Sequence, residues 1–253
     1  MSVVGIIPAR YQSTRLPGKP LADICGKPMI QHVYEKALQS GSLTSVTVAT
    51  DDERIIRKVE EFGGNAVLTS SLHKSGTDRI AEALCKTDSE DIDLVVNIQG
   101  DQPLLNPAMV DEAIHPFFSD ASLEMGTLSR RIDAQEEIKN PNVVKVVVNR
   151  AGFALYFSRS PIPYIRDQDY PVSFRKHIGT YVYRKDFLLK FTRMPQTNLE
   201  KAEMLEQLRA LENGHRIKVV ETRFDSVEVD TPEDLEKVRR IIGCTSSITS
   251  YSH

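Results

Sequence analysis

The feature that most constrains the fold of this chain is a regular alternation of short apolar runs with segments of helical periodicity. The runs at residues 3–7, 45–49, 66–68 and 94–98 are nearly continuous, which is typical of strands buried on both faces. Between the first two runs, apolar residues recur at helical spacing over residues 28–38. Alternating strands and helices predict an α/β fold, with a mostly parallel sheet and helices on both faces.

Later apolar runs predict a different kind of pairing. We expect them to form antiparallel strands, in an excursion from the parallel core, at residues 143–148, 154–157, 179–183 and 217–220. The chain then returns to a helix start at residues 231–234, where a threonine cap precedes a proline in the first turn.

Length and composition fit one α/β domain. The chain has 253 residues, of which 40% are hydrophobic, and this is enough for a sizeable core. No internal repeat or long linker divides the sequence, and its last ten residues are rich in serine and threonine. We therefore predict a single domain over residues 1–243 and a polar C-terminal tail over residues 244–253.

Charge and cysteine content limit the partners of the chain. The formal net charge is −3, so the chain as a whole does not attract nucleic acid or an anionic membrane. No apolar stretch reaches the ~18 residues that cross a bilayer. The cysteines Cys25, Cys85 and Cys244 are odd in number and far apart, which is typical of reduced thiols. The sequence predicts a cytoplasmic protein, in which any phosphate site must be built locally.

The loop after the first apolar run is the strongest candidate for such a site. It carries Arg10, Arg15 and Lys19 on one segment, with Ser13 and Thr14 between them. A triphosphate needs several cations and nearby backbone N–H donors, and a loop of this kind supplies both. Each cation alone would more often be a solvated surface residue. The three together favour a nucleotide site, although the loop is neither a Walker P-loop nor a dinucleotide fingerprint.

Two aspartates are candidate metal ligands. Asp101 follows the buried run at 94–98, where a carboxylate is costly unless it meets a cation. Mg²⁺ prefers one or two carboxylates together with substrate phosphates, so we expect Asp101 to bind it. Asp230, at a strand-to-helix junction, is either a second magnesium ligand or an extra acid at a helix N-terminus. The acids Asp51 and Asp52 have the same two readings, and we interpret both as helix caps.

Two further segments have polar residues that could meet a ligand. Residues 73–79 open a helix, so their N–H groups and Arg79 are available to a base or a phosphate. His177 is the histidine that stands out, and a structural role is as good an interpretation for it as a role in binding.

Taken together, these segments resemble the 3-deoxy-D-manno-octulosonate cytidylyltransferases, also called CMP-Kdo synthetases. The resemblance runs in register from about Val3 to Ile242. The matching stretches are IPARY at 7–11, STRLPGKPL at 13–21, GKPMI at 26–30, ATD at 49–51, SGT at 75–77, NIQGD at 97–101, ALYFSR at 154–159, EQLR at 206–209 and VDTPED at 229–234.

This resemblance implies a Rossmann-like nucleotidyltransferase fold and a homodimer formed through the inserted antiparallel portion. The implied reaction is CTP plus Kdo, an acidic eight-carbon sugar, giving CMP-Kdo and pyrophosphate for lipopolysaccharide biosynthesis. The residues implied to bind the nucleotide are Pro8, Ala9, Arg10, Ser13, Thr14, Arg15, Lys19, Ser75, Gly76 and Arg79. Those implied to line the sugar site are Gln99, Arg159, His177, Tyr181 and Glu206. Catalysis is implied for Arg10, Lys19, Asp101 and Asp230, the last two as Mg²⁺ ligands.

The sequence departs from the commonest family pattern at two positions. Gln102 stands where the family usually has glutamate, and Asp78 stands where glutamate usually precedes the arginine. Together with FDS at 224–226, these residues are similar to a branch that activates the 8-amino-8-deoxy form of the sugar. Kdo and its 8-amino analogue therefore both remain as substrates.

In the implied mechanism, the anomeric hydroxyl at C2 attacks the α-phosphorus of CTP in line and pyrophosphate leaves. Catalysis would rest mainly on positioning and charge neutralisation, and no side chain is assigned as the general base. The alternatives are another sugar nucleotidyltransferase, such as a CMP-sialate or hexose-1-phosphate enzyme, and a non-catalytic nucleotide-binding module.

Overall fold

The computed structural model describes residues 1–13, 15–87, 91–167, 169 and 171–249. The chain divides into two compact units. Unit 1 comprises Met1–Val110 and Ser226–His253, and unit 2 comprises Asp111–Asp225. The division of the sequence into a domain over residues 1–243 and a tail stays a prediction.

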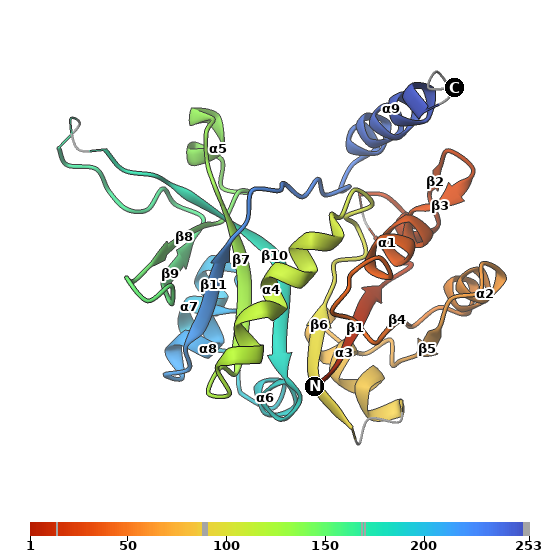
Figure 1. Cartoon of the computed structure of the whole chain (residues 1–253), viewed down its shortest axis with the longest axis horizontal. Coiled ribbons are helices and arrows are strands. Elements are labelled where there is room, and N and C mark those ends of the chain that lie inside the picture. Colours follow the sequence, from red (N-terminus) through yellow and green to blue (C-terminus); the bar gives the residue numbers. More distant parts are fainter. Residues whose placement is uncertain (14, 88–90, 168, 170, 250–253) are drawn as a thin grey trace. The chain divides into compact units, whose positions relative to one another are not determined.

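Unit 1 is built on a parallel sheet with the strand order β6-β1-β4-β5 (Figure 1). These strands are β1 (Ser2–Ala9), β4 (Ser45–Thr50), β5 (Ala66–Leu68) and β6 (Ile92–Asn97). The central strand β1 is buried along most of its length, as its valines and isoleucines predict. All four apolar runs assigned to the parallel core are therefore confirmed as strands.

In its described residues unit 1 has four α-helices and one 3₁₀ helix, and the first three α-helices connect these strands in turn. The helices are α1 (Met29–Ala37), α2 (Glu53–Glu61), α3 (Gly76–Lys86), α9 (Pro232–Thr249) and the short 3₁₀ helix η1 (Lys19–Leu21). The first two crossovers step outward from β1 to β5, and α3 then returns the chain to β6. Because such crossovers are right-handed, α3 covers the face of the sheet opposite to α1 and α2. This confirms helices on both faces.

The strand order creates a switch point between β1 and β6. Their connections leave in opposite directions, so the loops at their carboxyl ends separate and leave a crevice, where ligands bind in open α/β sheets. Gly100 lies in the loop after β6, and a Cβ atom there would stand 2.8 Å from the carbonyl oxygen of Pro8. Glycine at this position therefore lets the two loops approach closely.

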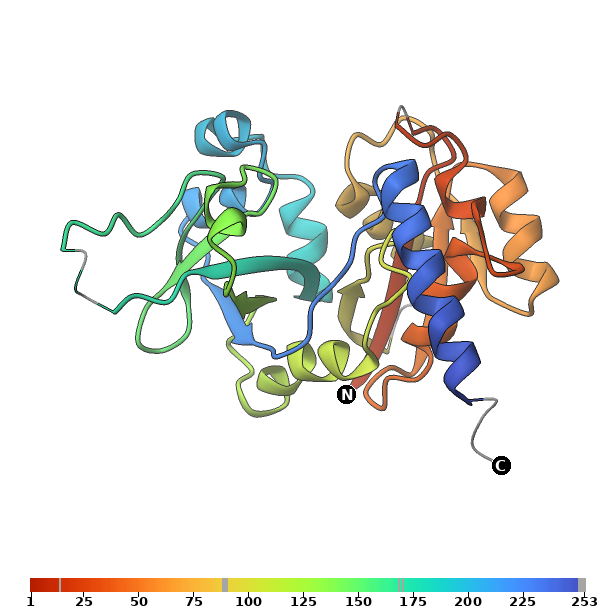
Figure 2. The same ribbon diagram turned by 90° about the horizontal axis from the view of Figure 1, so that it is seen from above.

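Helix α9 begins as the sequence predicts. The Thr231 hydroxyl accepts a hydrogen bond from the Asp234 N–H at 3.2 Å, and the Asp234 carboxylate accepts one from the Thr231 N–H at 3.0 Å. The helix packs beside the hairpin of β2 (Asp23–Ile24) and β3 (Lys27–Pro28), as Figure 2 shows. Its bounds reach Thr249, so the helix extends into the stretch predicted as a polar tail.

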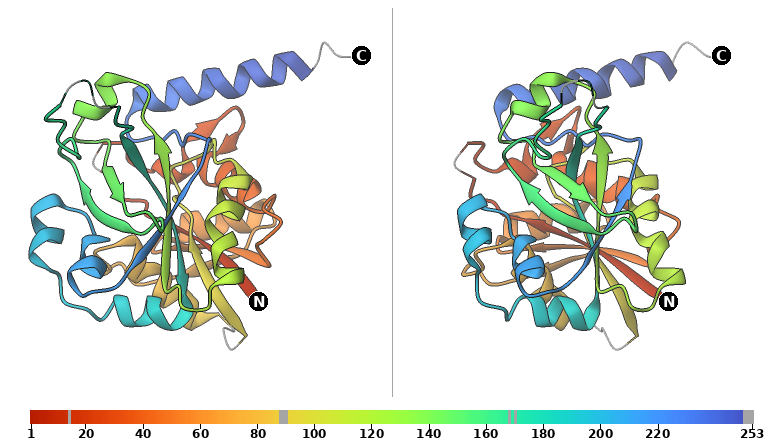
Figure 3. Two further views of the ribbon diagram at one scale, coloured as in Figure 1. Left: turned by 60° about the vertical axis from the view of Figure 1, so that its left-hand side comes forward. Right: turned by 90° about the vertical axis from the view of Figure 1, so that its left-hand side faces the viewer.

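Unit 2 contains a five-stranded mixed sheet with the order β11-β7-β10-β8-β9 (Figure 3). The strands are β7 (Met125–Arg131), β8 (Lys145–Val148), β9 (Ala154–Ser158), β10 (Arg175–Arg184) and β11 (Ile217–Glu221). The helices are α4 (Pro107–Ser119), which enters from unit 1, and α5 (Gln135–Lys139), α6 (Lys185–Phe191), α7 (Asn198–Glu203) and α8 (Leu208–Glu212).

The antiparallel prediction holds for three of the four later runs. Strands β8, β9 and β10 have antiparallel partners, but β11 pairs with β7 in parallel. The prediction for residues 217–220 is therefore wrong. A short apolar run has the same pattern in either direction, and the partner strand β7 was not predicted. In the part of the chain that the structure describes, no helix is long and apolar enough to cross a membrane.

Candidate functional site

A cavity of about 410 Å³ lies in unit 1 at the carboxyl ends of β1 and β6. The loop after β1, the loop after β6, the start of α3 and the segment before α9 all contribute to its walls. Ten of the predicted site residues line it, namely Pro8, Ala9, Arg10, Ser13, Arg15, Lys19, Gly76, Gln99, Asp101 and Asp230. Thr14, also predicted to bind the nucleotide, lies outside the described residues.

At one side of this cavity Lys19 joins the two predicted metal carboxylates. Its Nζ atom donates to Asp101 Oδ2 at 2.7 Å and to Asp230 Oδ1 at 3.2 Å. The Val229 N–H also donates to the Asp101 carbonyl at 2.9 Å, which holds the loop after β6 against the segment before α9. Asp230 receives a second cation, because Arg15 Nη2 lies 3.2 Å from its Oδ2. The structure therefore brings together residues that are far apart in the sequence.

The charge state of Lys19 follows from these contacts. Burial acts to lower the pKa of the ammonium group, but the charges of Asp101 and Asp230 and their hydrogen bonds outweigh it, so the pKa lies above its usual value. The interaction is thus fully present at neutral pH and is lost only as the pH rises past this raised pKa. Lys19 is a permanent cation at the edge of the cavity.

The same two carboxylates satisfy the donor requirements of a magnesium site. Both reach one ammonium group, so they are close enough to hold one small cation, and both are partly exposed to the cavity. Two carboxylates leave the remaining positions of an octahedral ion to water and phosphate oxygens, as Mg²⁺ prefers. Among the described residues there is no cluster of three or more His, Cys, Asp or Glu that could hold a metal without such help.

Arg10 also lines the cavity. Its Nη2 atom donates to the carbonyl oxygen of His73 at 2.7 Å. Burial, and then the nearby charge of Arg79, lower the pKa of Arg10, while the charges of Asp51 and Asp78 act to raise it. Because a guanidinium group stays charged even so, Arg10 keeps a positive charge at the cavity wall.

Arg79 is not among the residues that line the cavity. Its side chain is completely buried, its Nη2 atom lies 2.9 Å from Asp51 Oδ2, and its Nη1 atom donates to the Thr69 hydroxyl. The interpretation of Asp51 as a helix cap is therefore wrong, because this carboxylate pairs with a buried arginine. Asp52 is the confirmed cap, and its side chain accepts from the Arg54 N–H at the start of α2.

Ser75 also has a structural contact. It caps α3, where its hydroxyl accepts from the Asp78 N–H at 3.0 Å, and the next residue, Gly76, lines the cavity. Direct contacts of Ser75 and Arg79 with a nucleotide stay predictions.

Four of the predicted sugar-site residues lie in unit 2. The rings of His177 and Tyr181 are 5.3 Å apart on β10. Partial burial of the ring lowers the pKa of His177 to about 3, so His177 is neutral at neutral pH. Burial first, and then Tyr183 and Glu206, raise the pKa of Tyr181. The fifth residue, Gln99, is in unit 1, where its Nε2 atom donates to Asn97 Oδ1.

Arg159, the fourth residue of unit 2, has an organised guanidinium group. Its Nε atom donates to the carbonyl oxygen of Glu203 at 2.7 Å, and its Nη1 atom donates to that of Pro141 at 3.0 Å. The Glu203 carboxylate in turn accepts from the Arg159 N–H at 2.9 Å. The end of β9 is thereby fastened to the end of α7.

Comparison with known proteins identifies the family. The profile of the cytidylyltransferase family matches residues 4–217. A 3-deoxy-manno-octulosonate cytidylyltransferase of Geobacter metallireducens is 56% identical over 94% of this chain and 96% of its own length. The enzyme of the same name from Syntrophus aciditrophicus is 56% identical over 95% of this chain and 97% of its own. The chain belongs to the 3-deoxy-manno-octulosonate cytidylyltransferase family.

The fold agrees with this family assignment. The solved structure of a CMP:2-keto-3-deoxy-manno-octonic acid synthetase complexed with CTP superimposes with a TM-score of 0.92 at 46% identity. The superposition covers 97% of this chain and 100% of the chain in that solved structure. The Rossmann-like nucleotidyltransferase fold predicted from the sequence is confirmed.

In this cytidylyltransferase, some residues of the cavity were not predicted. Gln12, Pro20 and Gly100 line it in addition to the ten named above. All three lie inside segments that were singled out, so their position in the loops is the signal that could have found them. His73 contributes its main-chain carbonyl to Arg10, and a carbonyl contact leaves no mark in the sequence.

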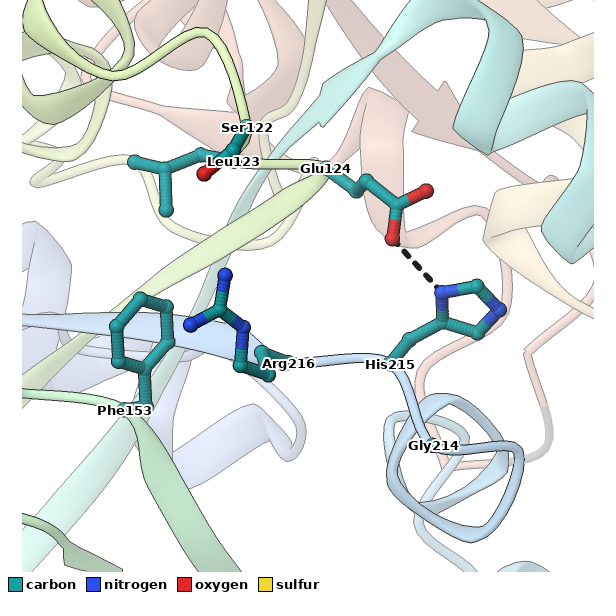
Figure 4. A pocket seen from close by; sticks show the side chains of 7 residues that line it. All are labelled: Ser122, Leu123, Glu124, Phe153, Gly214, His215 and Arg216. Atoms are coloured by element: carbon teal, nitrogen blue, oxygen red, sulfur yellow. Dashed lines mark hydrogen bonds and ion pairs between the residues drawn. The ribbon is translucent and has the colours of Figure 1, made fainter.

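The cytidylyltransferase has a smaller second cavity, of about 100 Å³, in unit 2 (Figure 4). None of the predicted site residues lines it. The Glu124 carboxylate faces the His215 ring, with 2.7 Å between Oε2 and Nδ1, and Arg216 lies over the ring of Phe153. These charged groups contact side chains of the same cavity, and we assign no function to it.

Proposed function

We propose that this chain transfers CMP from CTP to 3-deoxy-D-manno-octulosonate, releasing pyrophosphate and giving CMP-Kdo for lipopolysaccharide biosynthesis. The observation that carries this proposal is the cavity at the switch point of unit 1, where Lys19 joins Asp101 and Asp230. The names of the relatives that are 56% identical to this chain supply the nucleotide and the sugar.

The residues of the cavity fit this reaction by their charge. Arg10, Arg15 and Lys19 neutralise the triphosphate and hold its α-phosphorus open to attack by the sugar hydroxyl. The charge that grows on the leaving pyrophosphate is stabilised by the same cations, which are already fixed by the folded chain. We assign no side chain of the cavity as the general base.

We propose Mg²⁺ as the cofactor, held by Asp101 and Asp230 together with phosphate oxygens of CTP. When bound, the ion supplies positive charge to the phosphates and acidifies the attacking hydroxyl. Lys19 then has a second role, because its ammonium group keeps the two carboxylates together before the nucleotide and metal arrive.

Two further proposals concern the state of the protein. We propose a homodimer, supported by large exposed apolar side chains in unit 2, including Leu155, Tyr164 and Met204. Light scattering of the purified chain tests this, and a monomer at micromolar concentration would rule it out. We also propose a cytoplasmic location, supported by the exposed free thiols of Cys25 and Cys85 and testable by cell fractionation.

The reaction is tested by measuring pyrophosphate release. CTP, UTP and ATP are each combined with Kdo, with its 8-amino analogue and with a sialic acid, in the presence of Mg²⁺. We expect release to be fastest with CTP and Kdo. Faster turnover of the 8-amino sugar would assign the chain to the branch that activates this form. No turnover with any pair would indicate a non-catalytic nucleotide-binding module.

Replacing Lys19 with alanine should weaken CTP binding and slow transfer. A hydrogen bond from a charged group to phosphate contributes about 1.5 kcal/mol, so we expect the KM for CTP to rise roughly tenfold. The rate constant kcat should fall by a similar factor, because the leaving group loses a cation. Lys27→Ala is the matched control, since Lys27 is exposed on β3 and pairs with Glu35. Unchanged kinetic constants would place the triphosphate elsewhere.

Replacing Arg159 with lysine should affect the sugar more than the nucleotide. Lysine cannot reproduce the planar fork that Arg159 presents to several acceptors. We expect the KM for Kdo to rise about tenfold and that for CTP to change less than about twofold. Arg150→Lys, an exposed position in the same unit, is the control. Equal changes in both KM values would assign Arg159 a structural role only.

A further inference from the structure

We infer that Arg54 and Tyr11 form a clasp that holds the phosphate-binding loop, described over residues 10–13 and 15–19, in its binding shape. This inference rests on the proposed function, since it concerns how that loop is prepared for CTP. The name "clasp" refers to the stack of the Arg54 guanidinium group on the Tyr11 ring, whose centroid lies 3.3 Å from the guanidinium carbon. The contact joins the first turn of α2 to the start of the loop.

Arg54 is fixed before it meets the ring. Its Nε atom donates to Asp52 Oδ1 at 2.9 Å and its Nη2 atom donates to Oδ2 at 2.6 Å, so the guanidinium plane is set by a two-point contact. Asp52 is itself held, because it caps α2 by accepting from the Arg54 N–H at 2.9 Å. The hydrogen bond from Arg54 is also the main reason that the pKa of Asp52 is lowered. The helix therefore presents a rigid flat cation.

Tyr11 connects Arg54 to the other end of the loop, because it also contacts Gly18. Its carbonyl oxygen accepts a hydrogen bond from the Gly18 N–H at 3.0 Å, which closes the loop at its base. Gly18 has a φ of 68°, and a Cβ atom at this position would stand 3.3 Å from the tyrosine ring. The ring therefore contacts the guanidinium group and Gly18 alike.

These contacts also fix the position of Lys19. Gly18 is the N-cap residue of η1, so its position sets where Lys19 begins that turn. Lys19 then reaches Asp101 and Asp230 across the cavity. A continuous set of contacts thus runs from α2 through Arg54, Tyr11 and Gly18 to the ammonium group. Arg54 and Tyr11 are not among the residues that line the cavity, so they are positioning residues.

The clasp predicts a specific pattern of CTP affinity. A cation stacked on an aromatic ring at a partly exposed site accounts for a few-fold change in binding, so Arg54→Ala and Tyr11→Leu should each raise the Kd for CTP about fivefold. The double variant should also be about fivefold weaker, because either change alone removes the same contact. Arg54→Lys keeps the cation without the fork to Asp52, and should be intermediate.

The experiment combines calorimetric CTP binding with hydrogen exchange of the free protein. Without CTP, the amides of Gly18 and Lys19 should exchange faster in Arg54→Ala than in wild type. Arg57→Ala is the matched control, because Arg57 is an exposed arginine of the same helix.

The outcomes separate the clasp from the proposed function. Independent effects of the two substitutions, giving about 25-fold in the double variant, would overturn the clasp, and so would unchanged exchange at Gly18 and Lys19. If wild type bound no CTP while Arg54→Ala still speeded that exchange, the clasp would stand and the proposed function would fail.

Discussion

Asparagine in place of Asp101 or of Asp230 is expected to lower turnover about 100- to 1000-fold, the range found when one preorganised electrostatic contact is removed from an active site. Each substitution keeps the size of the side chain but removes a charge that both Lys19 and the proposed Mg²⁺ use. The fold should remain intact, because both carboxylates are partly exposed. Pyrophosphate release at several Mg²⁺ concentrations measures the effect, and circular dichroism checks the fold.

Glu233→Gln is the matched control for this prediction. Glu233 is an exposed acid near Asp230 in the first turn of α9, so it removes the same charge without touching the cavity. We expect its turnover to stay within about twofold of wild type, as for a surface substitution away from the site. If Asp230→Asn behaved like Glu233→Gln at limiting Mg²⁺, Asp230 would be an acid that serves only the helix start.

Much of the candidate site could be predicted because it lies at strand ends. The apolar runs located β1 and β6, and the loops that follow them contain Arg10, Lys19 and Asp101. For Asp230 the sequence permits two interpretations, a metal ligand or an acid at a helix start, because its neighbours in the sequence are compatible with both. The contact of Asp230 with Lys19 joins residues that are far apart in the sequence. The interpretation as a metal ligand therefore gains support only from the folded chain.

Strand β7 shows where apolar patterning fails. Its sequence contains glycine, threonine, serine and arginine, and no apolar run marks it, yet Thr127 and Ser129 are fully buried. The Thr127 hydroxyl is satisfied within the sheet, where it lies within hydrogen-bonding distance of the carbonyl oxygens of Ile178 and Thr180. A buried hydroxyl with such partners costs little, so Thr127 can be buried in the strand without the expected apolar pattern. Missing β7 also concealed the parallel direction of β11.

The adjacent acids Asp51 and Asp52 also show that the local sequence does not determine the role of a side chain. Both follow β4 and precede α2, so the local sequence predicts the same role for each. The difference is made by Arg79, which comes from α3 and is buried against Asp51. The choice between a cap and an ion pair therefore depends on a residue that the sequence places on another element.

Asp51→Asn is accordingly expected to destabilise the protein by about 3–5 kcal/mol, because it leaves the charge of Arg79 buried without its partner. The Arg79 side chain is 0% exposed and that of Asp51 only 19%, so water has little access to the charge left on Arg79. Urea unfolding, followed by far-ultraviolet circular dichroism, measures the change. Asp52→Asn is the matched control and should cost less than about 1 kcal/mol, since asparagine also caps helices and the lost Arg54 pair is exposed.

A double variant tests whether the cost belongs to the buried charge. Arg79→Met in the Asp51→Asn background removes the guanidinium group and replaces it with an apolar chain of similar length. Because replacing both members of a buried pair is far less costly than removing one, we expect the double variant to recover at least about half of the lost stability. If Asp51→Asn were no more destabilising than Asp52→Asn, the pair with Arg79 would contribute nothing measurable. If the double variant were less stable than Asp51→Asn, the contact of Arg79 with Thr69 would matter more than its charge.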